Sequence, residues 1–102
     1  MATLAFSVNN PLDSAAKAAI KLQNMLPQLE TQYGHLIQDL RQTWEGSTNA
    51  FSFKAKGYEI IGVLYIEDAT IDIEAEVPWA VTLMAGKIET MFRQKMLELL
   101  NS

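Results

Sequence analysis

The stretch that decides the fold is FSFKAKGYEIIGVLYIEDATIDIEAEVP, residues 51–78. Between residues 70 and 77, apolar side chains alternate strictly with the acids Asp72, Glu74 and Glu76. A period of two is typical of a half-buried β-strand that turns one face to water. The segment before it, residues 58–66, is apolar at both odd and even positions. It therefore predicts a second strand, with apolar side chains on both of its faces.

Turn-forming residues divide this part of the chain into short hairpins. The candidate turns are Gly46–Asn49, Lys56–Gly57 and Glu67–Asp68, which recur roughly every ten residues. They leave residues 40–45 and 51–55 as two further strands. Pro78 ends the series, because proline cannot donate to a strand ladder. Residues 3–8 also alternate, so we predict an antiparallel sheet of about five strands.

A helical segment is expected between the first strand and the others, from about Pro11 to Tyr33. Its apolar side chains recur at spacings of three and four residues, at Ala15, Ala18, Ala19, Leu22, Met25, Leu26 and Leu29. Asn10 is a suitable N-cap, because its amide oxygen can accept from a helix N–H that lacks a partner. Pro11 fits the first helical position, where no N–H is needed.

Two residues limit this helical segment. Pro27 lacks a backbone donor and collides with the turn before it, which predicts a kink or break near residues 24–26. The alternative is two short helices, the second of them opened by Pro27. Gly34 is expected to end the segment in a left-handed conformation.

The C-terminal segment predicts a last helix, from Pro78 or Trp79 to about Leu100. Its apolar stripe consists of Val81, Met84, Ile88, Met91, Phe92, Met96, Leu99 and Leu100. We expect the methionines of this stripe to fill the core, with an adaptable contact surface as the alternative. The order strand, helix, four strands, helix predicts an α+β fold with two helices packed on one face of the antiparallel sheet.

Length and composition narrow the class of protein. The 102 residues are expected to form a single domain, residues 1–102, and 49% of them are apolar. Neither a membrane-spanning segment nor a secretory signal is predicted, because long apolar runs and a basic leader are missing. The chain has no cysteine, which excludes disulfides and thiolate metal sites and fits a cytoplasmic location.

Charge argues against nucleic acid as a partner. The formal net charge is −4, and no Lys or Arg occurs between Gly57 and Gly86. Proteins that bind phosphate backbones carry clustered basic residues.

One set of motifs resembles a known family. It consists of Trp44-Glu45-Gly46, Phe51 and Phe53, Gly57, the strand Ile60–Ile66, the alternating run that ends at Pro78, and Ile88 in the last helix. This pattern resembles the polyhydroxyalkanoic acid system proteins, small bacterial proteins also described as granule-region proteins. The resemblance covers nearly the whole chain and implies a bacterial cytoplasmic protein linked with polyhydroxyalkanoate storage, with the granule or its proteins as partners. It implies no catalytic residues.

No residue pattern points to catalysis, and we predict no catalytic residue, no cofactor and no metal site. The chain has a single histidine, His35, and lacks a glycine-rich phosphate loop and a nucleophile motif. Asp72, Glu74 and Glu76 share one strand face, about 7 Å apart at each step. Such carboxylates can do acid–base chemistry or bind a hard cation, but we interpret them as a solvated strand face that hinders aggregation.

The strongest functional signal is therefore a contact surface around the strand at residues 58–66. Its candidate residues are Tyr58, Ile60, Leu64, Tyr65, Ile66 and Trp79. Helices that pack on one side of a sheet leave the other side exposed to solvent. An apolar strand on the exposed side indicates a binding surface for a partner. We expect a non-enzymatic interaction protein, with a homodimer through the sheet as the simplest cover. The alternative is a site for a small apolar ligand between the sheet and the C-terminal helix, with Tyr58, Tyr65 and Trp79 as polar anchors.

Overall fold

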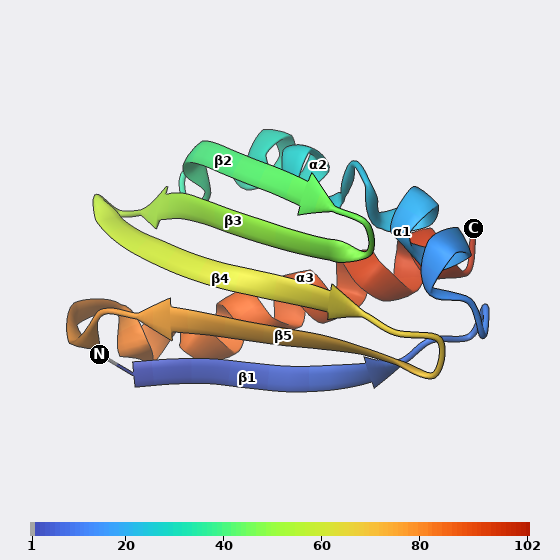
Figure 1. Ribbon diagram of the computed structural model, residues 1–102. Helices are drawn as coiled ribbons and strands as arrows, with labels where there is room; N and C mark the ends of the chain where they lie inside the picture. Colours follow the sequence, from blue (N-terminus) through green and yellow to red (C-terminus); the bar gives the residue numbers. More distant parts are fainter. Residues whose placement is uncertain (1) are drawn as a thin grey trace.

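A computed structural model describes residues 2–102 and shows one five-stranded antiparallel sheet with every described helix on the same face (Figure 1). The elements are β1 (Ala2–Asn9), α1 (Ala15–Leu22), α2 (Met25–Gln32), β2 (Gln38–Glu45), β3 (Thr48–Ala55), β4 (Tyr58–Ile66), β5 (Thr70–Val77), the 3-10 helix η1 (Trp79–Met84) and α3 (Ala85–Leu100). The predicted α+β class and the five strands are confirmed.

The strands lie in the order β1-β5-β4-β3-β2, so the first strand in the chain pairs with the last. Phe6 lies opposite Ile73, which in turn lies opposite Leu64. The strands from β2 to β5 are successive hairpins, as the turn spacing predicts. The β3–β4 turn has positive φ at both Lys56 and Gly57, 52° and 85°. This mirror-image turn matches the twist of the strands, and glycine adopts it without strain.

The first helical segment consists of two short helices, as the second alternative predicts, but Pro27 does not open the second one. α1 ends at Leu22 and α2 begins at Met25, so Pro27 falls in the first turn of α2 rather than opening it. N–H groups of a first turn have no partner within the helix, so the missing donor costs nothing there. The carbonyl of Asn24 accepts instead from the N–H of Gln28, at 3.0 Å.

The predicted start of the first helix is wrong. Ser14, not Asn10, is the N-cap, and its hydroxyl accepts from the Lys17 N–H. Asn10 is buried, donates to the carbonyl of Glu67 at 2.9 Å and accepts from the Leu12 N–H at 3.0 Å. Inside the fold, the Asn10 side chain satisfies several backbone groups at once, which stabilises the protein more than a single hydrogen bond at an exposed helix cap.

The predicted left-handed end at Gly34 is also wrong, because Gly34 is not among the described residues with a positive φ. Tyr33 caps α2 with its N–H bonded to the carbonyl of Leu29, and its own carbonyl then accepts from Leu36 and Ile37. These bonds satisfy the helix end without a left-handed residue.

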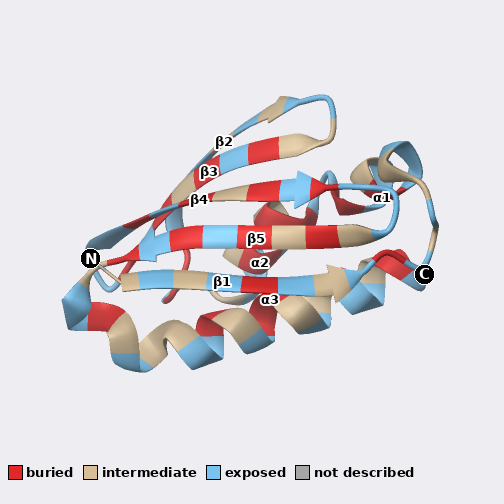
Figure 2. Ribbon diagram, turned by 60° about the horizontal axis from the view of Figure 1, so that its bottom comes forward, coloured by how far each residue is buried: buried red, intermediate tan, exposed pale blue. Residues whose placement is uncertain are grey.

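The core lies between the sheet and the helices. Buried and exposed residues alternate along β5, while the buried positions of α3 face the sheet (Figure 2). The rings of Phe51, Phe53 and Phe92 meet at centroid distances of 5.9 to 6.2 Å. Met91 and Met96 are buried with them, which confirms that these methionines fill the core.

A glycine on β4 makes room for one of these rings. An ideal Cβ on Gly62 would lie 2.5 Å from Cζ of Phe51 and 2.9 Å from the carbonyl oxygen of Glu74. Such distances lie far inside van der Waals contact, so the ring of Phe51 packs on the bare backbone of the central strand. Gly62 therefore sets the depth of the core at the middle of the sheet.

The two edge strands differ. β2 carries one extra residue relative to β3 between Gln38 and Arg41, and Asp39 adopts a positive φ of 53° at this bulge. β1 pairs with β5 without a shift in register. A bulge with a charged residue makes an edge a poor template for another strand.

Candidate interaction surface

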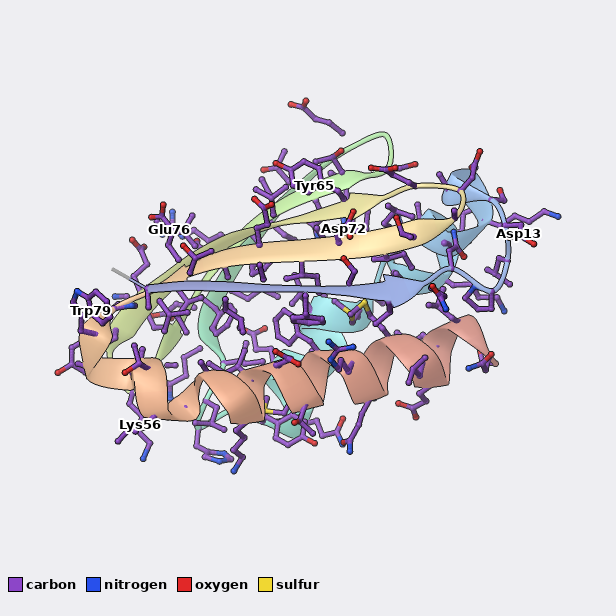
Figure 3. The ribbon with its side chains drawn as sticks, turned by 90° about the horizontal axis from the view of Figure 1, so that it is seen from below. Asp13, Lys56, Tyr65, Asp72, Glu76 and Trp79 are labelled. Atoms are coloured by element: carbon purple, nitrogen blue, oxygen red, sulfur yellow. The ribbon has the colours of Figure 1, made fainter. Side chains whose placement is uncertain are left out.

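The strand side chains that point away from the helices form an uncovered surface, here called the outer face. Figure 3 shows Tyr65, Asp72 and Glu76 on the side of the sheet away from α3. Each strand contributes one row of outward side chains to this face, here called a stripe. The stripes lie side by side, because neighbouring strands pair in register. The central stripe lies on β4 and is apolar: Ile61, Val63 and Tyr65.

This apolar stripe is accessible. Ile61 and Tyr65 are 48% and 40% exposed, and Val63 between them is partly exposed. On an antiparallel sheet with one wet face, the central strand ordinarily presents polar residues to water. The stripe departs from that pattern over three successive outward positions.

An acidic stripe on β5 lies directly beside it. Glu76 is opposite Ile61, Glu74 is opposite Val63, and Asp72 is opposite Tyr65. Asp72 also accepts a hydrogen bond from the hydroxyl of Ser7 on β1. The three carboxylates thus line one border of the apolar stripe, in water and spaced along a single strand.

The other border of the stripe, on β3, is uncharged: its outward residues are Thr48, Ala50 and Ser52. The basic residues of the face lie beyond this border. Ser52 of β3 lies opposite Ile61, and Arg41 of β2 lies opposite Ser52. Lys54 follows on β3, 3.9 Å from the carboxylate of Asp39, with both side chains at least half exposed. A hollow of about 730 Å³ opens here, beside the bulge of β2, and is lined by polar and charged groups.

The six residues predicted from the sequence do not form one surface. Ile60, Leu64 and Ile66 are 0%, 0% and 5% exposed, so they belong to the core and cannot meet a partner. The reason is the period of two: the even positions of β4 face the helices, and the odd positions face outward. Tyr65 lies on the outer face, whereas Tyr58 and Trp79 lie exposed at one end of the molecule.

The sequence reasoning missed Ile61 and Val63, which lie on the same strand face as Tyr65. Both faces of β4 are apolar, and nothing in the sequence alone says which one the helices cover. The covered side follows from Gly62, because its missing side chain admits the ring of Phe51.

The space between the sheet and α3 is filled. The rings of Phe51, Phe53 and Phe92 occupy its centre, and Leu64 and Met96 around them are 0% exposed. Tyr58, Tyr65 and Trp79, expected as anchors of an apolar ligand, are 40% to 71% exposed and do not belong to this filled space. The arrangement supports contact at the outer face rather than enclosure of a ligand.

A second exposed apolar feature lies in η1, and the sequence reasoning missed half of it. Leu83 is 99% exposed and Trp79, four residues earlier, is 71% exposed. A signal was present, because Leu83 falls out of phase with the stripe formed by Val81, Met84 and Ile88.

The remaining polar candidates are dispersed. His35 is exposed in the connector between α2 and β2. Within residues 2–102, no three His, Asp or Glu side chains gather closely enough to hold a metal ion. No helix in this same range is long and apolar enough to cross a membrane.

Comparison with known proteins gives one result. The family model described as putative polyhydroxyalkanoic acid system protein matches residues 10–100. No curated protein and no solved structure matches the chain.

Proposed function

The chain belongs to the polyhydroxyalkanoic acid system protein family, and on that premise we propose that it is a non-enzymatic accessory protein of polyester granule storage in the bacterial cytoplasm. It acts by contact, through the outer face of its sheet. The observation that carries this proposal is the apolar stripe of Ile61, Val63 and Tyr65 on the central strand, uncovered by any described helix. Apolar side chains that are adjacent and open to water favour association.

We first consider a second copy of the chain as the partner that packs on the outer face. The distribution of charge on this face determines the direction of the two-fold axis. Two sheets packed face to face can be related by a two-fold axis along the strands or across them. An axis across the strands would lay the acidic stripe on its own copy. An axis along β4 exchanges the positions of β5 and β3, so the acidic stripe lies over the uncharged outward side chains of β3, and Lys54 is the next outward residue beyond them. We therefore propose a homodimer whose axis runs along β4.

The size of the face is sufficient for such a dimer. Five strands of about eight residues make a surface roughly 24 Å wide and 26 Å long, by the usual strand spacing and rise. Two such faces bury on the order of 1,200 Å², which is the lower end of stable interfaces.

Light scattering of two variants tests the dimer. Ile61→Lys and Tyr65→Lys each place a cation opposite an existing acid, Glu76 or Asp72, so the fold should tolerate them. Each removes apolar area from the interface and should raise the dimer Kd at least about tenfold. The matched control is Thr3→Lys, which also faces Glu76 but lies on the edge strand. Equal dimerisation by all the variants, or a monomeric native chain, would refute the face-to-face dimer.

Granule association is tested separately, by sedimentation of tagged chain with granules from a polymer-accumulating bacterium. We expect the native chain to co-sediment and Ile61→Lys to be depleted from the granule fraction. A chain found only in the soluble fraction would contradict the storage role. A reaction that is lost in the triple variant Asp72→Asn, Glu74→Gln, Glu76→Gln would contradict the non-enzymatic assignment.

A further inference from the structure

Three exposed large apolar side chains lie at one end of the sheet, where η1 follows β5 and β4 begins. Leu83 and Trp79 of η1 are 99% and 71% exposed, and Tyr58 at the start of β4 is 46% exposed. β4 begins at Tyr58, and Trp79 follows the end of its antiparallel neighbour β5, so both residues lie at the same end of the sheet. These three residues are here called the apolar tip.

The figures agree on the position of the tip. In Figure 1, the β3–β4 turn, the end of β5 and η1 lie at the same end of the sheet, opposite α1. Figure 3 places Trp79 and Lys56 at that end as well, far from Asp13. The tip therefore projects along the length of the molecule rather than from the outer face.

The backbone beneath the tip is firmly held. Val81 is buried between Trp79 and Leu83 and has a non-helical φ of −116°. Its N–H donates to the carbonyl of Pro78 at 3.0 Å, and the hydroxyl of Thr82 donates to the carbonyl of Trp79 at 2.9 Å. Because Val81 is anchored inward, its neighbours Trp79 and Leu83 are directed to solvent. These two hydrogen bonds and the burial of Val81 hold the backbone of η1, and so they fix the direction in which Trp79 and Leu83 project.

The charges near the apolar tip limit the kinds of surface that it can bind. No acid occurs from residue 77 to residue 88, and the cations nearest to the tip along the chain are Lys56 and Lys87. Binding to an anionic bilayer relies on clusters of four to eight basic residues, whereas the whole chain has a net charge of −4. The tip is thus suited to an uncharged apolar surface.

An aliphatic polyester has this chemistry. Its methylene and methyl groups suit Leu83 and the aromatic rings, while its ester carbonyls accept hydrogen bonds. The indole N–H of Trp79 and the hydroxyl of Tyr58 are donors, and such side chains favour boundaries with one apolar and one polar side. We propose that the apolar tip docks the protein directly on the polyester surface, an inference that rests on the proposed storage role.

The proposed dimer would strengthen this docking. A two-fold axis along β4 leaves both tips at the same end of the assembly, so two tips can meet one surface. Two linked contacts hold more tightly than either alone. Docking by a single copy does not require the dimer.

The test is co-sedimentation with protein-free particles of amorphous poly(3-hydroxybutyrate). The variants are Leu83→Asp and Trp79→Ala, and each should weaken binding about tenfold or more, because it removes an apolar contact. The matched control is Ile20→Asp, which alters a 72% exposed side chain on α1, at the opposite end. Circular dichroism of each variant confirms that the fold is kept. Vesicles of neutral and of anionic phospholipid are the comparison surfaces.

Binding of the native chain that both tip variants lose and Ile20→Asp retains would support the proposal. Equal binding by all variants, no binding to bare polymer, or tip-dependent binding to vesicles alone would overturn it. A chain that sediments with cellular granules but not with bare polymer keeps the storage role and loses this inference. A chain that binds bare polymer but never enters the granule fraction loses the storage role instead.

Discussion

At the scale of single residues, Gly62 shows how one missing side chain orients the whole molecule. The ring of Phe51 lies where its Cβ would be, so this side of β4 can only be the covered one. The opposite side then carries Ile61, Val63 and Tyr65 into water. The position of the candidate site is thus a packing consequence of a glycine in a strand, where glycine otherwise weakens structure.

Gly62→Ala is expected to destabilise the protein by about 1–3 kcal/mol, the usual cost of overpacking. The new methyl group must displace either the ring of Phe51 or the β5 backbone at Glu74. Urea unfolding measures the change. The control is Gly86→Ala at the start of α3, where a Cβ would meet no atom within 4 Å; it should be neutral or stabilise by up to about 1 kcal/mol. Equal effects of the two substitutions would contradict the packing role.

At the scale of elements, Pro27 shows that position within a helix matters more than the presence of a proline. It lies in the first turn of α2, after the break at Gln23–Asn24. One residue later, the N–H of Gln28 is already bonded to Asn24. The boundary between tolerated and disruptive proline therefore falls between residues 27 and 28.

Pro27→Ala should change the free energy of unfolding by less than about 1 kcal/mol, because no hydrogen bond is gained or lost. Gln28→Pro should cost about 3 kcal/mol, because it removes the bond to Asn24. Thermal unfolding followed by circular dichroism compares the two. If both variants were equally stable, the hydrogen bond from Gln28 to Asn24 would contribute nothing to the stability of α2.

At the scale of the whole molecule, the N-terminal strand and the loop after it are joined to the last hairpin of the sheet. β1 pairs with β5, and Asn10 then holds the β1–α1 loop against the β4–β5 turn through Glu67. The backbone N–H of Asn10 adds a bond to the carbonyl of Ala69 at 2.9 Å. Segments almost sixty residues apart are joined at this one side chain.

Asn10→Ala should therefore destabilise the fold by about 2–3 kcal/mol, because it removes a buried amide that donates to Glu67 and accepts from Leu12. The control is the neighbouring Asn9→Ala, whose side chain is exposed. Chemical unfolding of both variants gives the comparison. A cost as small for Asn10 as for Asn9 would show that the loop is held by its backbone alone.

The sequence was sufficient for the strands, the turns and the apolar stripe of the last helix, because each depends on local periodicity. It was insufficient for Asn10, whose partners lie in a distant turn. It placed Ile60, Leu64 and Ile66 in the contact surface because β4 is apolar on both faces, and only packing distinguishes the two. The exposed Leu83 was missed although it falls out of phase with the apolar stripe of the last helix, since an apolar residue in a helix is expected to be inside.

The bulge at Asp39 has a consequence for crowded conditions. Proteins gathered at high local concentration risk joining sheet to sheet into fibrils, which grow when fresh strands add at a flat border. Here the edge strand β2 is bent by its bulge and carries a charged residue there, so a strand from another molecule cannot pair with it in register. Whatever brings many copies together, fibrils do not grow by strand addition at the β2 edge.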